Sequence, residues 1–182
     1  GAVLVLLGGL VVSAMPPTAA ILQWDLLVDL RGAPVGRMVG LGVVILGLAL
    51  LSAAWLQLCG RARRFDLTDP VAGVALVRIA VVLWSLPLLV APPLFSRDGW
   101  SYAAQGMLTR LDLSPYEHGP SALVRPGADP GPIVQAVDPR WMDTITPYGP
   151  VPLVLGDLAA GVTSGPWSLV IAHRLVALVG LV

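Results

Sequence analysis

The most constraining feature of the sequence is the stretch from Met38 to Leu58, which carries no charged side chain. A helix needs about 20 consecutive apolar residues to cross the hydrocarbon core of a bilayer, and this stretch has that length. A basic cluster from Arg61 to Arg64 follows directly, which is typical of the cytoplasmic end of a membrane helix. We therefore expect a transmembrane helix over 38–58 with its C-terminal end in the cytoplasm.

Four further apolar stretches predict a bundle of such helices. The chain is 56% hydrophobic and 12% charged, whereas a soluble domain is usually about 45–50% apolar and about 25% charged. We expect an all-α fold, a polytopic transmembrane helix bundle. The first and last stretches reach the ends of the chain, so we expect them to be truncated spans in a fragment of a larger protein. Besides 38–58, the expected spans are 1–14, 71–91, 148–164 and 167–182.

The connection between 38–58 and 71–91 contains a helix start signal. Asp69 precedes Pro70, and an Asp cap followed by Pro in the first turn is typical of a helix N-terminus. Because 71–91 crosses back from the cytoplasmic side, we expect the loop 92–147 on the external face.

The loop 92–147 concentrates charged, aromatic and proline residues in an otherwise apolar chain. From Gly99 to Leu111 its apolar residues recur at three- and four-residue steps, which is the pattern of one helical face. We expect an amphipathic helix that begins just after a span and lies along the membrane interface. The residues of this pattern are Trp100, Ala103, Ala104, Met107, Leu108 and Leu111.

Asp98 stands at the start of this predicted helix and allows two interpretations. As an N-cap it would accept backbone N–H bonds and stabilise the helix by roughly 0.5–2 kcal/mol. As a catalytic base beside Arg97, it would stay ionised and accept a proton from a sugar hydroxyl. The two roles are compatible, because one carboxylate has two oxygens.

Aromatic and basic residues in the loop also allow two interpretations. An exposed Tyr or Trp is most often an anchor at the membrane interface, but four in one polar loop also suit stacking on a pyranose ring. An Arg is most often a solvated charge, although its planar fork also suits a phosphate group. The aromatic residues are Tyr102, Tyr116, Trp141 and Tyr148, and the basic ones are Arg97, Arg110, Arg125 and Arg140.

The remaining chemistry-bearing residues form no recognised motif. Cys59 is the only cysteine, which excludes an internal disulfide and any multi-cysteine metal site. We expect no nucleic-acid partner because the net charge is zero. No metal and no cofactor is predicted, because His118, Asp138 and Asp143 follow no known ligand spacing. The last two spans contain ionisable residues that are either functional or a satisfied helix–helix pair, namely Asp157, His173 and Arg174.

Three groups of residues in the loop match a known family in order and spacing. They are Phe95-Ser96-Arg97-Asp98 with Tyr102-Ala103-Ala104-Gln105-Gly106, Pro115-Tyr116 with Gly119-Pro120, and Asp138-Pro139 with Trp141, Thr144 and Pro147-Tyr148-Gly149-Pro150. With these residues the central third of the chain resembles the actinobacterial polyprenol-phosphomannose-dependent α-1,6-mannosyltransferases, which are membrane glycosyltransferases of the GT-C type. Gly99, Met142 and Ile145 depart from the residues usual in that family.

The resemblance implies a reaction and a set of site residues. Mannose would pass from polyprenyl-phosphate-mannose to a lipid-anchored mannan acceptor, forming an α-1,6 linkage with inversion, at the external face of a bacterial plasma membrane. Asp98 would be the catalytic base, and Arg97 and then Arg140 would support the phosphate. Residues expected to bind donor or acceptor are Arg97, Tyr102, Gln105, Tyr116, Arg140, Trp141 and Tyr148.

Two other functions remain open from the residues alone. A polytopic transporter would place its ionisable groups near the bilayer midplane, where Asp157, His173 and Arg174 are the candidates. A non-catalytic membrane scaffold would need only the spans, but it gives no reason for the Arg-Asp and Pro-Tyr-Gly-Pro clusters.

Overall fold

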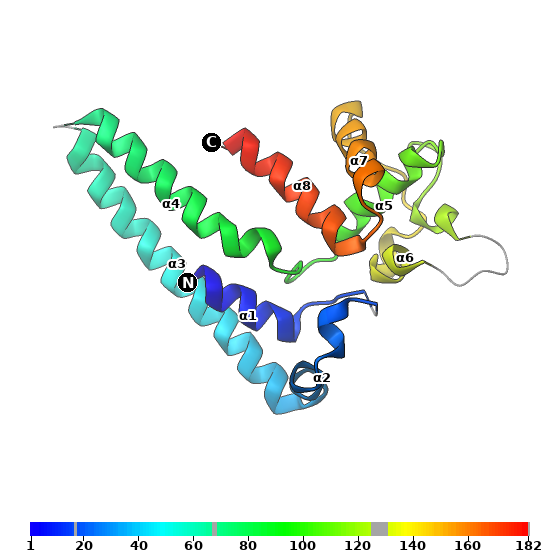
Figure 1. The fold of residues 1–182 in the computed structure, drawn as a ribbon, viewed down its shortest axis with the longest axis horizontal. Helices are drawn as coiled ribbons and strands as arrows, with labels where there is room; N and C mark the ends of the chain where they lie inside the picture. Colours follow the sequence, from blue (N-terminus) through cyan, green and yellow to red (C-terminus); the bar gives the residue numbers. More distant parts are fainter. Residues whose placement is uncertain (17, 67–68, 125–130, 182) are drawn as a thin grey trace. The chain divides into compact units, whose positions relative to one another are not determined.

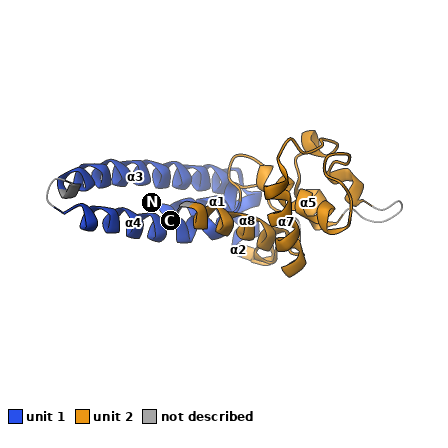
Figure 2. Ribbon diagram, turned by 90° about the horizontal axis from the view of Figure 1, so that it is seen from above, with its two compact units in different colours: residues 1–12, 26–92, 182 blue, residues 13–25, 93–181 orange. Residues whose placement is uncertain are grey.

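The computed structural model describes residues 1–16, 18–66, 69–124 and 131–181, and within them every regular element is a helix (Figure 1). The all-α part of the expected fold is therefore confirmed for this part of the chain. The chain divides into two compact units, Gly1–Val12 with Leu26–Pro92 and Ser13–Asp25 with Pro93–Leu181 (Figure 2).

The first unit is built on two long helices, α3 (Pro34–Asp66) and α4 (Pro70–Val90). The shorter α1 (Ala2–Val12) packs against both of them. A β-carbon on Gly8 of α1 would lie only 2.6 Å from the carbonyl oxygen of Gly40 in α3. The α1 and α3 backbones therefore pack in direct contact at this point. The short α2 (Asp25–Gly32) precedes α3.

Both α3 and α4 are long and apolar enough to cross a membrane. Only 17% of the most apolar window of α3 and 6% of that of α4 is buried in the protein, whereas the core helix of a soluble protein is mostly covered. The expected span 38–58 is the middle of α3, which also includes Arg61 to Arg64. The predicted start of α4 is confirmed, because the side chain of Asp69 accepts the backbone N–H of Ala72 at 3.1 Å.

The second unit is organised around α5 (Asp98–Arg110). This helix contacts each of the neighbouring elements α6 (Pro132–Ala136), α7 (Pro150–Val162), α8 (Pro166–Leu181) and the short 3₁₀ helix η2 (Pro120–Leu123). Two other 3₁₀ helices of the unit are η1 (Ala20–Gln23) and η3 (Pro139–Trp141).

The amphipathic helix predicted from Gly99 to Leu111 is confirmed, and most of its apolar face is buried against protein, while its place at the membrane interface stays a prediction. Trp100, Ala103, Ala104 and Leu108 are fully buried, and the first three of them form one core with residues of α6 and α8. The indole N–H of Trp100 donates to the carbonyl of Ala14 at 3.2 Å. This part of the apolar stripe is covered by α6 of the loop and by α8, whereas Leu111 stays exposed.

A pair of glycines sets the crossing of α5 and α7. A β-carbon on Gly106 would lie 2.7 Å from the carbonyl oxygen of Gly156, and one on Gly156 would lie 2.9 Å from the Cα of Gly106. The close approach of these backbones also fixes the position of the chain just before α7, where Tyr148 lies. The spans expected at 148–164 and 167–182 correspond to α7 and α8, whose place in a membrane stays a prediction.

Candidate functional site

One face of α5 lines a hollow of about 180 Å³, called here the first hollow. Ser101 and Tyr102 lie three and four residues after Asp98, and Gln105 lies four and three residues after them, so the four side chains project from the same side of the helix. The opposite wall comes from the segment between η3 and α7. Its lining residues are Trp141, Thr144, Ile145, Pro147 and Tyr148.

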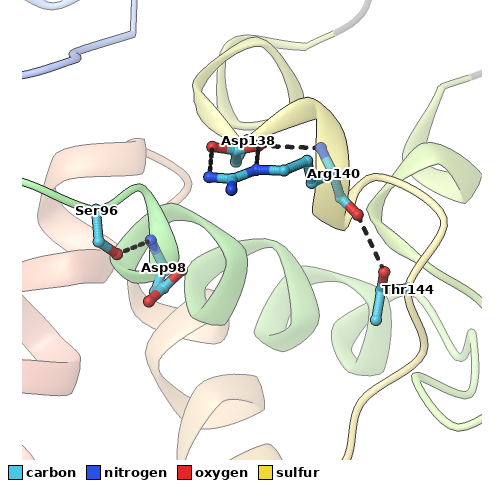
Figure 3. Close-up of polar contacts among 5 residues, drawn as sticks. All are labelled: Ser96, Asp98, Asp138, Arg140 and Thr144. Atoms are coloured by element: carbon cyan, nitrogen blue, oxygen red, sulfur yellow. Dashed lines mark hydrogen bonds and ion pairs between the residues drawn. The ribbon is translucent and has the colours of Figure 1, made fainter.

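Asp98 is the first residue of α5 and does not act as its cap. The N-cap position belongs to Arg97, which provides no side-chain cap bond, so the capping role predicted for Asp98 is wrong. The backbone N–H of Asp98 donates instead to the hydroxyl of Ser96 at 3.0 Å (Figure 3). The carboxylate still lies in the first turn, where the helix dipole favours a negative charge, and it lines the first hollow.

Beside Trp141, Asp138 and Arg140 form a two-point ion pair. Nε and Nη2 of Arg140 donate to the two carboxylate oxygens of Asp138, each at 3.0 Å, and the backbone N–H of Arg140 also donates to Asp138 (Figure 3). These bonds lower the pKa of Asp138 to about 2, with a further contribution from Arg97. The pKa of Arg140 is raised, mainly by Asp138 and also by Asp98.

Thus Arg97, Asp98, Asp138 and Arg140 interact electrostatically as one group of alternating charges. Asp98 contributes to the first hollow, whereas the two Arg residues are not part of its lining. A ligand in the hollow therefore meets the carboxylate directly and has the two guanidinium groups nearby.

Tyr102 of α5 and Tyr148 before α7 face each other across the site. Their hydroxyl oxygens are 3.2 Å apart and share a hydrogen bond. Their rings meet edge to face, with centroids 5.4 Å apart and planes at 71°. The bond to Tyr148, followed by burial, raises the pKa of Tyr102 to about 12, so this phenol stays protonated at neutral pH.

A buried threonine fixes the orientation of the Gln105 amide. The hydroxyl of Thr146 accepts the backbone N–H of Tyr148 at 3.3 Å and donates to Oε1 of Gln105 at 3.1 Å. Thr146 is itself held by its backbone N–H, which donates to the carbonyl of Pro115 at 2.8 Å. Because Oε1 faces Thr146, the two N–H bonds of Gln105 Nε2 point the other way and can donate to a ligand.

Ser101 and Thr146 are site residues that the sequence interpretation missed. Ser101 is 7% exposed, and its hydroxyl has no hydrogen-bond partner among the described residues. Its position three residues after Asp98, on the same helical face, was a signal that pointed to it. No local pattern marked Thr146, because its role depends on the side chain that packs opposite.

Of the residues expected to bind donor or acceptor, Tyr102, Gln105, Trp141 and Tyr148 line the first hollow together with Asp98. Tyr116 is exposed and does not contribute to the lining. Arg97 and Arg140 are not part of the lining either, but they interact electrostatically with Asp138 and Asp98. Arg110 lies 3.9 Å from Asp157 of α7, so the structure shows an ion pair between helices for Asp157. Arg125 lies outside the described residues.

The scattered acidic residues and His118 have separate partners. The carboxylate of Asp143 accepts the hydroxyl of Ser121 at 2.6 Å. Nδ1 of His118 lies 3.3 Å from the carbonyl of Ser114, and Asp138 is bound to Arg140. No group of three His, Cys, Asp or Glu residues that could hold a metal ion is found in the described ranges.

Comparisons of the chain with known proteins show its family. The family described as "Alpha-(1->6)-mannopyranosyltransferase, N-terminal domain" matches residues 1–182. The chain belongs to this family. The resemblance noted in the sequence is thereby confirmed, and the motif residues Asp98, Tyr102, Gln105, Trp141 and Tyr148 of this family member surround one hollow.

Curated relatives carry the same activity in their names. Alpha-(1->6)-mannopyranosyltransferase A of Corynebacterium glutamicum is 34% identical over 143 residues, which is 76% of this chain and 28% of the relative. The A enzyme of Mycobacterium tuberculosis is 38% identical over 104 residues, or 57% of this chain and 18% of the relative. The B enzyme of C. glutamicum is 28% identical over 145 residues, which is 77% of this chain and 24% of the relative.

The chain thus spans about a quarter of the length of the curated relatives that it matches. These relatives are glycosyltransferases by name and come from actinobacteria. No solved structure matches the chain.

Proposed function

We propose that the full-length protein is a membrane mannosyltransferase that uses the first hollow for its chemistry. It transfers mannose from polyprenyl-phosphate-mannose to a lipid-anchored mannan acceptor and forms an α-1,6 linkage with inversion. The observation that carries this proposal is the convergence of Asp98, the Gln105 amide and aromatic rings on one hollow, in a chain of the mannosyltransferase family.

In this proposal the terminal sugar of the acceptor occupies the first hollow. Its ring stacks on Trp141 or Tyr148, and its hydroxyls bond to Gln105 Nε2. Asp98 accepts the proton of the attacking hydroxyl while that oxygen forms a bond to the anomeric carbon of the donor. The bond between the anomeric carbon and the phosphate oxygen breaks, and the polyprenyl phosphate leaves with the bonding electrons. General-base assistance of this kind typically contributes about 10²–10⁴-fold to the rate.

The leaving phosphate needs positive charge close to Asp98. Arg97 is adjacent in sequence, and Arg140 interacts electrostatically with Asp98. Asp138 accepts one N–H bond each from Nε and Nη2 of Arg140, so both N–H bonds of Nη1 and the second one of Nη2 are left for the phosphate. Asp138 therefore acts as a positioning residue that holds the guanidinium in place.

The proposed enzyme is a multi-pass protein of the bacterial plasma membrane. Helices α3 and α4 are the two proposed spans, with apolar, exposed side chains, and the Arg61 to Arg64 cluster supports a cytoplasmic side for the connection between them. The segment that follows α4, with α5 and the first hollow, is then external, where a lipid-linked donor and a lipid-anchored acceptor meet.

The test is transfer of radiolabelled mannose from polyprenyl-phosphate-mannose to a mannan acceptor in membranes that contain the full-length protein. We expect Asp98→Asn to abolish transfer while its amount in the membrane equals that of the wild type. Asp112→Asn is the matched control, because Asp112 is an exposed carboxylate beyond the end of α5 whose positive φ of 58° suits Asn. If Asp98→Asn still transferred mannose, Asp98 would not be the catalytic base.

A further inference from the structure

A second hollow of about 280 Å³ adjoins the first one. The two share three lining residues, Tyr102, Gln105 and Tyr148. The hydrogen-bonded tyrosine pair therefore belongs to the walls of both. The other residues that line the second hollow are Gly106, Pro152, Leu153 and His173.

The second hollow offers polar groups of both kinds. Nδ1 of His173 lies 2.8 Å from the carbonyl of Leu169, and because a carbonyl only accepts, Nδ1 carries the proton. In the neutral ring Nε2 is then an acceptor. Nε2 of His173 faces Gly156, because a β-carbon built on Gly156 would lie 3.3 Å from this nitrogen. The donors of this hollow are the Nε2 N–H bonds of Gln105, whose carbonyl is turned to Thr146.

We propose that the second hollow is a sugar subsite that binds the pyranose next to the one in the first hollow. This inference rests on the proposed function, since it makes the occupant the second sugar of the mannan acceptor. A hydrocarbon chain would cover Nε2 of Gln105 and Nε2 of His173 without giving either a hydrogen-bond partner, which is costly. A hydroxylated ring can satisfy donors and acceptors together and still pack on Pro152 and Leu153.

The tyrosine pair gives the two subsites a common wall. Both rings line both hollows, and they stand at 71° to each other with their hydroxyls bonded. A disaccharide would thus contact the pair on both sugars, with the reacting sugar beside Asp98 and the second beside His173. The enzyme would prefer an acceptor of at least two sugars over a single sugar.

The experiment compares a mannose glycoside with an α-1,6-dimannoside glycoside as acceptors for radiolabelled mannose, in membranes with the full-length protein. The wild type should use the dimannoside with a kcat/KM about tenfold higher, as expected for one or two added hydrogen bonds. His173→Phe removes the acceptor nitrogen, and Leu153→Trp fills the hollow. In both variants the ratio of the two kcat/KM values should fall towards one.

Leu158→Trp is the matched control, because Leu158 lies on the same helix as Leu153 but is 61% exposed and lies outside the lining of the second hollow. It should keep the wild-type ratio. A ratio near one in the wild type, or a ratio unchanged in both hollow variants, would overturn the subsite and leave the proposed function standing. No transfer to either acceptor by the wild type would overturn the proposed function, and the subsite with it.

Discussion

The α3 helix in the first unit and the α5 helix in the second unit use apolar residues in opposite ways. Along α3, large apolar residues such as Leu41, Ile45 and Leu46 each expose more than 40% of their surface. Along α5, Trp100 and Leu108 are fully buried among neighbouring helices. The presence of apolar residues therefore does not by itself predict whether protein or membrane covers them. The length and uniformity of the stretch do, because residues 38–58 of α3 are apolar on all sides of the helix, whereas α5 has one polar face.

Helix α5 has a polar face, whereas the apolar stretches of α3 and α4 in the first unit have none. On α5 one side is buried, and the other carries Asp98, Ser101, Tyr102 and Gln105 into the first hollow. The comparison teaches that the second unit needs protein packing to place the residues of the hollow, whereas the first unit exposes large apolar faces, as expected of membrane spans. Each prediction below alters one side of this comparison.

The largest effect is expected where backbones touch. In Gly106→Leu the new side chain meets the backbone of Gly156, so α5 and α7 must separate and Tyr102 moves away from Tyr148. A displacement of this size should lower mannose transfer by about 100-fold or more. Gly42→Leu on α3 is the control, because nothing lies within 4 Å of its β-carbon position. Comparable activity of the two variants would show that the glycine contact does not position the site.

A charge placed on the exposed face of α3 should test the other side of the comparison. Leu46→Arg puts a guanidinium in the middle of the expected span, at a cost of roughly 2.5–3.5 kcal/mol for membrane insertion. We expect a smaller membrane-inserted fraction, measured by the accessibility of an engineered glycosylation site in a reporter fusion. Leu111→Arg, at an exposed position just after α5, should insert like the wild type. Equal insertion of both variants would contradict a span over 38–58.

A smaller effect is expected from the support of the Gln105 amide. Thr146→Val keeps the shape of the side chain and removes the hydroxyl that bonds to Gln105. The loss of one such bond should raise KM for the acceptor about fivefold. Thr109→Val is the control, because the hydroxyl of Thr109 bonds only to a helix carbonyl. A KM that rises equally in both variants would mean that amide orientation is not what Thr146 provides.

The smallest effect on mannose transfer is expected from Asp138→Asn, and this effect should not depend on pH between 5 and 8. Its folded pKa of about 2 lies below the ordinary value of 3.8, so the stabilisation from its ionised form is complete above the ordinary value and is lost as pH falls through about 2. Between pH 5 and 8 the pair with Arg140 stays intact. Asp138→Asn should therefore lower transfer less than about fivefold, by the same factor across this range. A factor that changes with pH in this window would show that Asp138 titrates there.

Local patterns predicted the helices well, because caps and periodicity are local. Asp69 with Pro70 marked the start of α4, and the three- and four-residue spacing marked α5. Most of the site also followed from motif residues, with Tyr102, Trp141 and Tyr148 lining one hollow. One miss is local, because Asp98 begins α5 instead of capping it and its backbone N–H donates to Ser96. The other depends on a distant partner, since Thr146 gains its role only when α5 packs opposite. Tyr116 carries the same motif signal but is turned to the surface.

The contact between Gly106 and Gly156 has a consequence for biosynthesis. The two walls of the first hollow come from separate segments of the chain, and the contact between these glycines holds α5 against α7, the helix that follows the second wall. Since a chain folds from its N-terminus as it is made, α1, α3 and α4 can assemble while the ribosome has not yet completed α7. The hollow forms only after α7 has emerged and docked. Under the proposed function, the two spans of such a nascent protein are complete before its site is, which keeps an unfinished enzyme from acting on lipid-linked sugars.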